Sequence, residues 1–299
     1  ESGGSVQANI EACMLVGSDL NFIVGEADYL PASHPLGRKR TPVADSSGRR
    51  VVRIEQPTPC GPMLAEEVWE KGQKPARTKM FIEEEADYRK VNALLRALRE
   101  CRADITANLA AKRREVGESG LFMVFVPQPM EMFYLILHDS MVMHYLDWPD
   151  TFRAAMEEVE ETSLFIIDCA ADAGADMIMF GGAGTEIFSP DMIERHIIIP
   201  SAGYVKRCEE RKLFSLMHCC GRTKIFLERG WFEQVRPTIF ESFTPLPLGD
   251  IESPEEAAAQ LPAETFFKGG LSLELLLKGT PEDAAEAAEK AVKTFGGRR

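Results

Sequence analysis

The sequence has few basic residues for its size. Its 299 residues include 34 Lys and Arg against 47 Asp and Glu, a formal net charge of −13. Binding to nucleic-acid phosphates needs concentrated Lys and Arg, so no nucleic-acid partner is expected. The chain also lacks an apolar run near the roughly 20 residues that span a membrane, and its first residues lack the charged-then-apolar pattern of a signal peptide. We therefore expect a cytoplasmic protein with no membrane partner.

Cysteine is sparse and has no framework spacing. The seven cysteines are an odd number scattered along the chain, which indicates reduced thiols rather than a disulfide scaffold. The chain also lacks a phosphate-loop sequence and a Gly-x-Ser-x-Gly elbow. Its glycine-rich stretch Gly181-Gly-Ala-Gly184 does not have Gly-x-Gly-x-x-Gly spacing. These absences argue against a nucleotide-binding fold and a serine hydrolase.

Alternating strand and helix patterns are present instead. Short apolar segments followed by amphipathic stretches recur from about residue 121 onward, which is typical of βα units around a parallel sheet. The length suits one α/β barrel, and 45% apolar residues supply a core. We predict an α/β fold, a (β/α)₈ TIM-type barrel that forms one domain over residues 1–299. The predicted strands are 121–126, 177–180, 214–217, 238–240 and 265–267, with earlier candidates at 22–24 and 51–55.

The number of strands is smaller than a closed barrel needs. We therefore expect a barrel that is incomplete at one or both ends of the given chain. Residues 31–48 are predicted to form a loop. Capping residues predict three helices, which are 150–173, one that opens at Ser189-Pro190, and one from Thr280-Pro281 to Phe295.

The strongest local signal is the segment Phe214-Ser-Leu-Met-His-Cys-Cys-Gly221, where a predicted strand runs into a His-x-Cys-Gly turn. Residues two apart in a strand share a face, so His218 and Cys220 can point at one ion. An imidazole and a thiolate suit Zn²⁺. A catalytic zinc site takes three protein ligands, however, and a hydrogen-bonded histidine beside two packing thiols explains the same residues equally well.

Two carboxylates each follow a predicted strand, and a carboxylate just past a strand end faces the barrel mouth. Glu241 can act as a metal ligand, as a partner of a ligand or as a base, or it can be a solvated loop carboxylate. Glu186 follows the glycine-rich stretch, whose glycines let a ligand approach the backbone and whose amides can bind anions. The candidate catalytic residues are therefore Glu241 and Glu186.

Five segments together resemble the uroporphyrinogen decarboxylase superfamily in order and spacing. They are Ala173-Gly-Ala-Asp-Met-Ile-Met, Phe188-Ser-Pro-Asp-Met, the His-x-Cys-Gly turn, Gly249-Asp250 and Leu277-Lys-Gly-Thr-Pro-Glu-Asp. The resemblance covers residues 115–299 well and the first hundred loosely. It implies a (β/α)₈ barrel and one of two kinds of enzyme, namely cofactor-free decarboxylases of a tetrapyrrole or cobalamin-dependent methyltransferases that use zinc. The Arg-Gln-Ala-Gly-Arg and Phe-Ser-Asp segments of the decarboxylases are missing, so the chain is more similar to the methyltransferase branch.

That branch implies zinc bound by a His-x-Cys pair, here His218 and Cys220, and by a second Cys far downstream. No Cys follows Cys220 in this sequence. The third ligand is then Glu241, a residue beyond Arg299, or absent. By the same resemblance, a methyl group would move between methylcobalamin on a partner corrinoid protein and a small thiol or amine acceptor. The residues expected to shape the approach of the corrinoid cofactor are Gly181, Gly182, Gly184 and Thr244.

Two other readings stay open at this point. The first is a decarboxylase of a tetrapyrrole or another acid, which would work without metal. The second is a corrinoid- or tetrapyrrole-binding barrel without catalysis. The oligomeric state is open as well, with a homodimer as one option.

Overall fold

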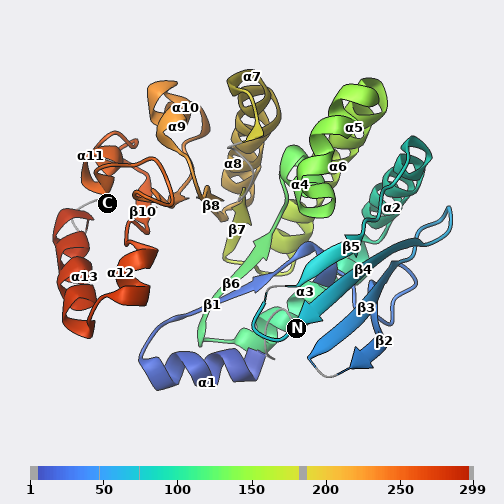
Figure 1. The fold of residues 1–299 in the computed structure, drawn as a ribbon, viewed down its shortest axis with the longest axis horizontal. Helices are drawn as coiled ribbons and strands as arrows, with labels where there is room; N and C mark the ends of the chain where they lie inside the picture. The colour runs from blue at the N-terminus through green and yellow to red at the C-terminus, as the bar shows by residue number, and fades with distance from the viewer. Residues whose placement is uncertain (1–5, 47, 74, 182–186, 296–299) are drawn as a thin grey trace. The chain divides into compact units, whose positions relative to one another are not determined.

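The protein is described by a computed structural model over residues 6–46, 48–73, 75–181 and 187–295 (Figure 1). It contains two compact units, residues 1–176 and 177–299. The N-terminal unit carries most of the long helices and an antiparallel sheet, and the C-terminal unit carries the strands that follow residue 176. The sequence-based prediction of a single domain stays a prediction.

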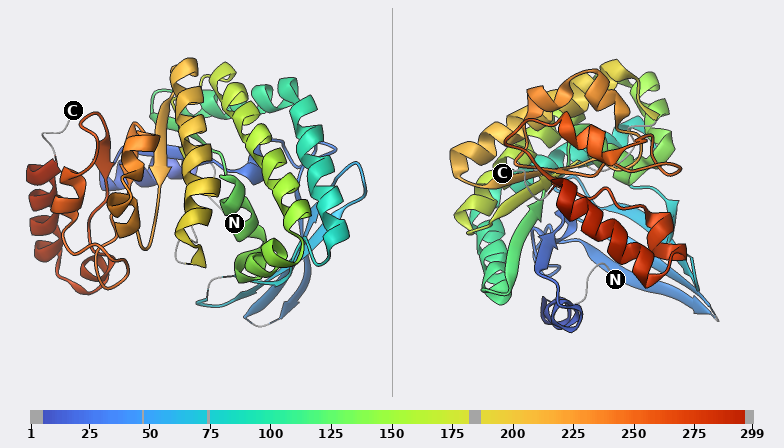
Figure 2. Two further views of the ribbon diagram at one scale, coloured as in Figure 1. Left: turned by 90° about the horizontal axis from the view of Figure 1, so that it is seen from above. Right: turned by 90° about the vertical axis from the view of Figure 1, so that its left-hand side faces the viewer.

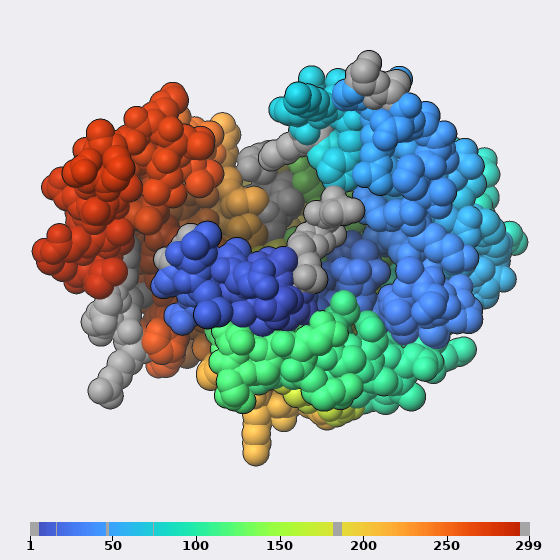
Figure 3. All heavy atoms as spheres, turned by 90° about the horizontal axis from the view of Figure 1, so that it is seen from below, coloured from blue at the N-terminus to red at the C-terminus, as the bar shows by residue number. Residues whose placement is uncertain are grey.

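Two parallel strands form the centre of the N-terminal unit. β1 (Leu20–Val24) pairs with β6 (Gly120–Phe125), and Leu20 lies opposite Gly120. A Cβ atom at position 120 would lie 2.1 Å from the Leu20 carbonyl oxygen, so this close approach requires glycine. The predicted strands 22–24 and 121–126 are therefore confirmed, each with a small shift in its ends. α1 (Val6–Val16) packs against β1 and against α3 (Arg102–Val116), and the two helices lie side by side in Figure 3.

Helices surround this pair of strands. α2 (Tyr88–Glu100) and α6 (Pro149–Asp172) run along each other, as Figure 2 shows. The 3-10 turn η1 (Glu26–Asp28) follows β1, while α4 (Pro129–Leu137), η3 (His138–Ser140) and α5 (Met141–Asp147) follow β6. Buried Tyr88, Phe133 and Phe152 join these helices, with the rings of Phe133 and Phe152 4.7 Å apart. α6 begins at Pro149 instead of the predicted Asp150, because proline already suits the first turn of a helix.

A four-stranded antiparallel sheet completes the N-terminal unit. It has the order β2 (Lys39–Ser46), β3 (Arg49–Gln56), β4 (Met63–Glu70) and β5 (Ala76–Lys79), and η2 (Glu85–Asp87) follows it. The prediction of a loop over 31–48 is wrong for β2, which pairs along its length with β3. The predicted strand at 51–55 exists, but it belongs to this sheet. Its burial alternates along the strand, which is typical of an antiparallel sheet with one covered face.

Among its described residues, the C-terminal unit contains four parallel strands. They are β7 (Met177–Phe180), β8 (Phe214–His218), β9 (Ile239–Glu241) and β10 (Phe266–Lys268), paired in that order. Helices connect them, with α7 (Pro190–Ile193), a π-helical turn (Glu194–Ile198) and α8 (Ile199–Arg211) before β8. α9 (Lys224–Glu228) and α10 (Trp231–Val235) precede β9, and α11 (Pro254–Ala259) precedes β10. α12 (Leu273–Lys278) and α13 (Pro281–Phe295) follow the last strand.

These connections confirm the predicted α/β class. All four predicted strands of this unit are present, and β7 has the predicted ends. The caps at Ser189 and Thr280 are also confirmed, because their hydroxyls accept hydrogen bonds from Met192 N and Asp283 N. Within the described residues, the two units hold two and four parallel strands, fewer than the eight of a closed barrel. No helix in the described part of the chain is long and apolar enough to cross a membrane.

Candidate active site

The site is built at the carboxyl ends of three neighbouring strands. His218, Glu241 and Lys268 are the last residues of β8, β9 and β10. The register pairs His218 with Glu241, and Glu241 with Lys268. The carboxyl ends of parallel strands are where α/β proteins place their functional side chains. The three residues therefore form one row at the mouth of the C-terminal unit, with the carboxylate in the middle.

The Glu241 carboxylate lies between two cationic groups. Its Oε1 atom is 3.0 Å from Lys268 Nζ, and its Oε2 atom is 3.5 Å from His218 Nδ1. The Glu241 side chain is 21% exposed, so the pair with His218 is only partly screened by water. Contact with His218, assisted by Lys268, holds the pKa of Glu241 below its usual value despite burial. These contacts therefore favour the ionised form of Glu241.

His218 also contacts two side chains near the row. Contacts with Cys220 and then with Glu241 raise its pKa to about 9, against the opposing effect of burial. Its Nδ1 atom is buried and has no hydrogen bond of ordinary geometry, since Glu241 lies at ion-pair distance. Cys220 is exposed, whereas the neighbouring thiol of Cys219 is buried. In the predicted His-x-Cys pair, His218 is therefore held by its contacts, whereas Cys220 lies at the surface.

Two loops are held together beside this row. A Cβ atom on Gly249 would lie 2.1 Å from the Thr244 carbonyl oxygen and 2.8 Å from the Gly221 carbonyl oxygen, so glycine lets the loop after β9 lie against the loop after β8. Asp250 Oδ1 accepts hydrogen bonds from Thr223 N at 2.8 Å and from Lys224 N at 3.1 Å. The Gly249-Asp250 pair thus joins the two loops that follow the site residues.

The other candidate residues are only partly described. Gly181 directly follows β7 with φ of 83°, a left-handed conformation that favours glycine. Thr244 is half-buried in the loop after β9 and accepts a backbone hydrogen bond from Ile251. The remaining candidates, Gly182, Gly184 and Glu186, lie outside the described residues.

The ligand atoms of the predicted zinc site are not gathered around one point. Among the described residues, three candidate ligand atoms lie within 4.8 Å of one another at His34, Cys101 and Asp104, and not at His218, Cys220 and Glu241. The cluster at His34 does not suit a metal. His34 Nδ1 accepts a hydrogen bond from Leu36 N, which in the neutral ring leaves the proton on Nε2, the atom that faces Asp104. Cys101 donates to the Ala97 carbonyl, and burial raises the pKa of its thiol.

Lys268 is the functional candidate that sequence reasoning missed. The signal was present, because Lys268 directly follows the predicted strand 265–267, as Glu241 follows its own strand. An exposed lysine near a strand end is common, and its significance here comes from the 3.0 Å contact with Glu241.

Comparison with known proteins assigns the family. The family model described as Uroporphyrinogen decarboxylase (URO-D) matches residues 66–299. The chain belongs to the uroporphyrinogen decarboxylase family. Membership places it in a group of enzymes and confirms the resemblance seen in its motifs. No curated protein sequence matches the chain.

Solved structures bear on the fold. A methyltransferase from Methanosarcina mazei is similar with a TM-score of 0.51 and 15% identity, over 75% of this chain and 65% of that chain. At this identity the likeness concerns the fold, which is of the TIM-barrel type, with no closed barrel among the described residues. A mandelate racemase/muconate lactonizing enzyme-like protein from Rubrobacter xylanophilus has a TM-score of 0.13 and 9% identity, over 64% of this chain and 78% of that chain, and carries no argument.

Proposed function

We propose that the protein is a zinc-assisted methyltransferase that moves a methyl group between a corrinoid on a partner protein and a small thiol or amine acceptor. The observation that carries the proposal is the imidazole of His218, which contacts both Cys220 and Glu241 at adjoining strand ends. Membership of the uroporphyrinogen decarboxylase family and the fold shared with a methyltransferase support it.

The donor types of the row suit zinc. An imidazole nitrogen, a thiolate sulfur and a carboxylate oxygen are all zinc ligands in proteins. The His218 Nδ1 atom is buried and makes no ordinary hydrogen bond, so its lone pair could serve as a zinc ligand. Because the three ligand atoms are not all within 4.8 Å of one another, binding requires a side chain to rotate inward. Cys220 is exposed, so its side chain has room to do so.

The side chains of the chain itself would then have distinct tasks. Zinc held by His218, Cys220 and Glu241 would lower the pKa of an acceptor thiol or amine, so that the acceptor becomes the nucleophile. Lys268 keeps Glu241 ionised by its charge, and Glu241 orients the His218 ring. Gly181 and Thr244 follow β7 and β9 and would shape the space into which the methyl donor comes.

Zinc content tests this assignment directly. Purified protein is expected to hold stoichiometric zinc that is lost in His218→Ala and in Cys220→Ser, together with methyl transfer from methylcobalamin to a small thiol. Cys60→Ser and His138→Ala are matched controls, because both side chains are exposed in the other unit. A folded protein that binds no zinc, or binds it equally in all four variants, would refute the proposal.

Decarboxylation is the second candidate, and Lys268 is the observation that favours it. A half-exposed ammonium group at the mouth can hold a substrate carboxylate, and a charged His218 could supply a proton to the carbanion. The family model also carries the decarboxylase description. This reading predicts an activity that is indifferent to chelators and lost in Lys268→Met, whereas the methyltransferase should lose activity with its zinc.

A further inference from the structure

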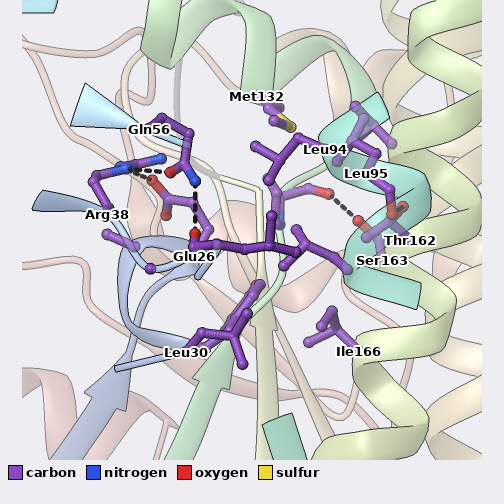
Figure 4. A pocket seen from close by; sticks show the side chains of 17 residues that line it. Glu26, Leu30, Arg38, Gln56, Leu94, Leu95, Met132, Thr162, Ser163 and Ile166 are labelled. Carbon is purple, nitrogen blue, oxygen red and sulfur yellow. Dashed lines mark hydrogen bonds and ion pairs between the residues drawn. The ribbon is translucent and has the colours of Figure 1, made fainter. Parts of the chain in front are cut away.

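An apolar cavity lies inside the N-terminal unit, apart from the residues of the candidate site. It has a volume of about 60 Å³ and is enclosed by α2, α6 and the loops that follow β1 and β6. Each probe-sized water occupies about 10–15 Å³ by this measure, so the space suits about four or five non-hydrogen atoms. Figure 4 shows Arg38, Gln56 and Glu26 together on one side of the cavity, and aliphatic side chains with the hydroxyls of Thr162 and Ser163 on the other. The aliphatic lining includes Leu94, Leu95, Val159 and Ile166, all buried.

The polar end of the cavity is formed by Arg38. Its Nε atom donates a hydrogen bond to Gln56 Oε1 at 3.0 Å, and Gln56 in turn donates to the Leu36 carbonyl at 2.9 Å. The guanidinium also lies over the ring of Phe81 at 5.6 Å. These contacts fix the plane of the guanidinium and leave its two terminal nitrogens directed away from the bond to Gln56.

Among the described residues, the terminal nitrogens of Arg38 make an ion pair but no hydrogen bond. The partner is Glu26, which also lines the cavity and whose Oε1 atom lies 3.7 Å from Nη1, too far for a hydrogen bond. The neighbouring Arg40 and Arg77 share a single carboxylate, that of Glu67. Burial, and then the charges of Arg77 and Arg40, lower the pKa of Arg38 against the opposing effect of Glu26. The Arg38 side chain is only 19% exposed, so water compensates its charge incompletely.

The geometry points to a binding site for a short-chain monocarboxylic acid, with its carboxylate on the Arg38 terminal nitrogens and its alkyl chain among Leu94, Val159 and Ile166. A carboxylate accepts two parallel hydrogen bonds from a guanidinium, and this is the strongest partner for such a fork. A neutral or cationic ligand of the same size would fill the apolar space but leave the guanidinium nitrogens without an acceptor. The two hydroxyls at the far side, Thr162 and Ser163, already donate to backbone carbonyls, which leaves that side to the alkyl chain.

Calorimetric titration with three ligands of equal chain length tests the site. Sodium propanoate is expected to bind the full chain saturably, with a stoichiometry of one and with an affinity more than about tenfold above those of propan-1-ol and propylamine, because only the carboxylate makes charge-assisted hydrogen bonds. Absence of saturable propanoate binding, or equal binding of the alcohol, would overturn the inference.

Variants locate the binding. Arg38→Met should abolish the preference for propanoate over propan-1-ol, and Leu98→Phe should remove binding of both by filling the cavity. Arg53→Gln is the matched control, because Arg53 is an exposed arginine on β3 that pairs with Glu66 and does not line the cavity. If Arg38→Met does not fold, the binding of the three ligands to the wild type and to Leu98→Phe still tests the site. Equal loss of propanoate binding in Arg53→Gln would place the anion elsewhere and contradict the site.

Discussion

Glu67 in the N-terminal unit and Glu241 in the C-terminal unit are both carboxylates bracketed by two cations, yet their surroundings differ. Glu67 lies within β4, is 10% exposed and pairs with Arg40 and Arg77. Glu241 ends β9, is 21% exposed and pairs with His218 and Lys268. Guanidinium groups keep their charge, whereas imidazole and ammonium groups exchange protons. The first cluster can therefore hold a sheet together, and the second can change its charge and take a ligand.

The largest expected effect is on the N-terminal cluster. Glu67→Gln leaves the largely buried guanidinium of Arg77, and the more exposed one of Arg40, without their shared carboxylate, which should lower the free energy of unfolding by about 3 kcal/mol. Denaturant unfolding measures the change. Glu66 pairs with Arg53 and is more exposed than Glu67, so Glu66→Gln should change the free energy of unfolding by only about 0.5 kcal/mol. Equal effects of the two substitutions would show that the Glu67 cluster has no structural role.

Close packing of the loops beside the site should give the next largest effect. Gly249→Ala brings a methyl group against the Thr244 carbonyl oxygen, so the loops after β8 and β9 must separate at a cost of about 2 kcal/mol. Thermal unfolding, together with zinc content, follows both consequences. Gly203→Ala on α8 meets no atom within 4 Å and should stabilise the protein by about 0.8 kcal/mol. If Gly249→Ala changes neither stability nor zinc content, the two loops do not depend on each other.

The two clusters should also differ in their response to pH. In metal-free protein the folded state raises the pKa of His218 from 6.5 to about 9. The resulting stability is fully present below pH 6.5 and is lost as the pH rises through about 9, by about 1 kcal/mol for this partly exposed group. Glu241 has a lowered pKa, so its contribution is present above its usual value of 4.5 and is lost as the pH falls below it.

Unfolding curves of metal-free wild type and His218→Asn, recorded between neutral and alkaline pH, measure this difference. The two curves should approach each other as the pH rises. A constant gap across the range would contradict the assigned titration of His218.

The smallest expected effect belongs to Lys268. Lys268→Met removes one partner of Glu241, so the pKa of Glu241 should rise, while stability changes by only about 0.5 kcal/mol because the ammonium group is half-exposed. Lys268→Arg keeps the charge and should keep the pKa. Carboxyl resonances in an NMR titration report the shift of the Glu241 pKa. An unchanged Glu241 titration in Lys268→Met would show that Lys268 has no role in the site.

Much of the C-terminal unit could be predicted from sequence. Met177–Phe180 is a continuous apolar segment bounded by Asp176 and Gly181, so both its type and its ends are locally encoded. The adjacency of His218 and Glu241 follows from two strands that end in polar residues, because parallel strands align their carboxyl ends. The distance between the ligand atoms does not follow, since it depends on side-chain rotation.

Less of the N-terminal unit could be predicted from sequence. β2 carries Lys39, Arg40, Pro42 and Asp45, which are poor strand formers, and it becomes a strand through its pairing with β3. The Arg38 cavity joins segments that are far apart in the sequence, from Glu26 to Ile166. Neither feature has a local pattern, because both arise from tertiary contacts.

Zinc K-edge X-ray absorption of the purified protein reports the ligands of the proposed metal site. We expect bound zinc with one sulfur ligand at about 2.3 Å and the remaining ligands nitrogen or oxygen, and loss of the sulfur signal in Cys220→Ser. Zinc without a sulfur ligand, an unchanged spectrum in Cys220→Ser, or a folded protein without zinc would contradict a metal site at His218 and Cys220.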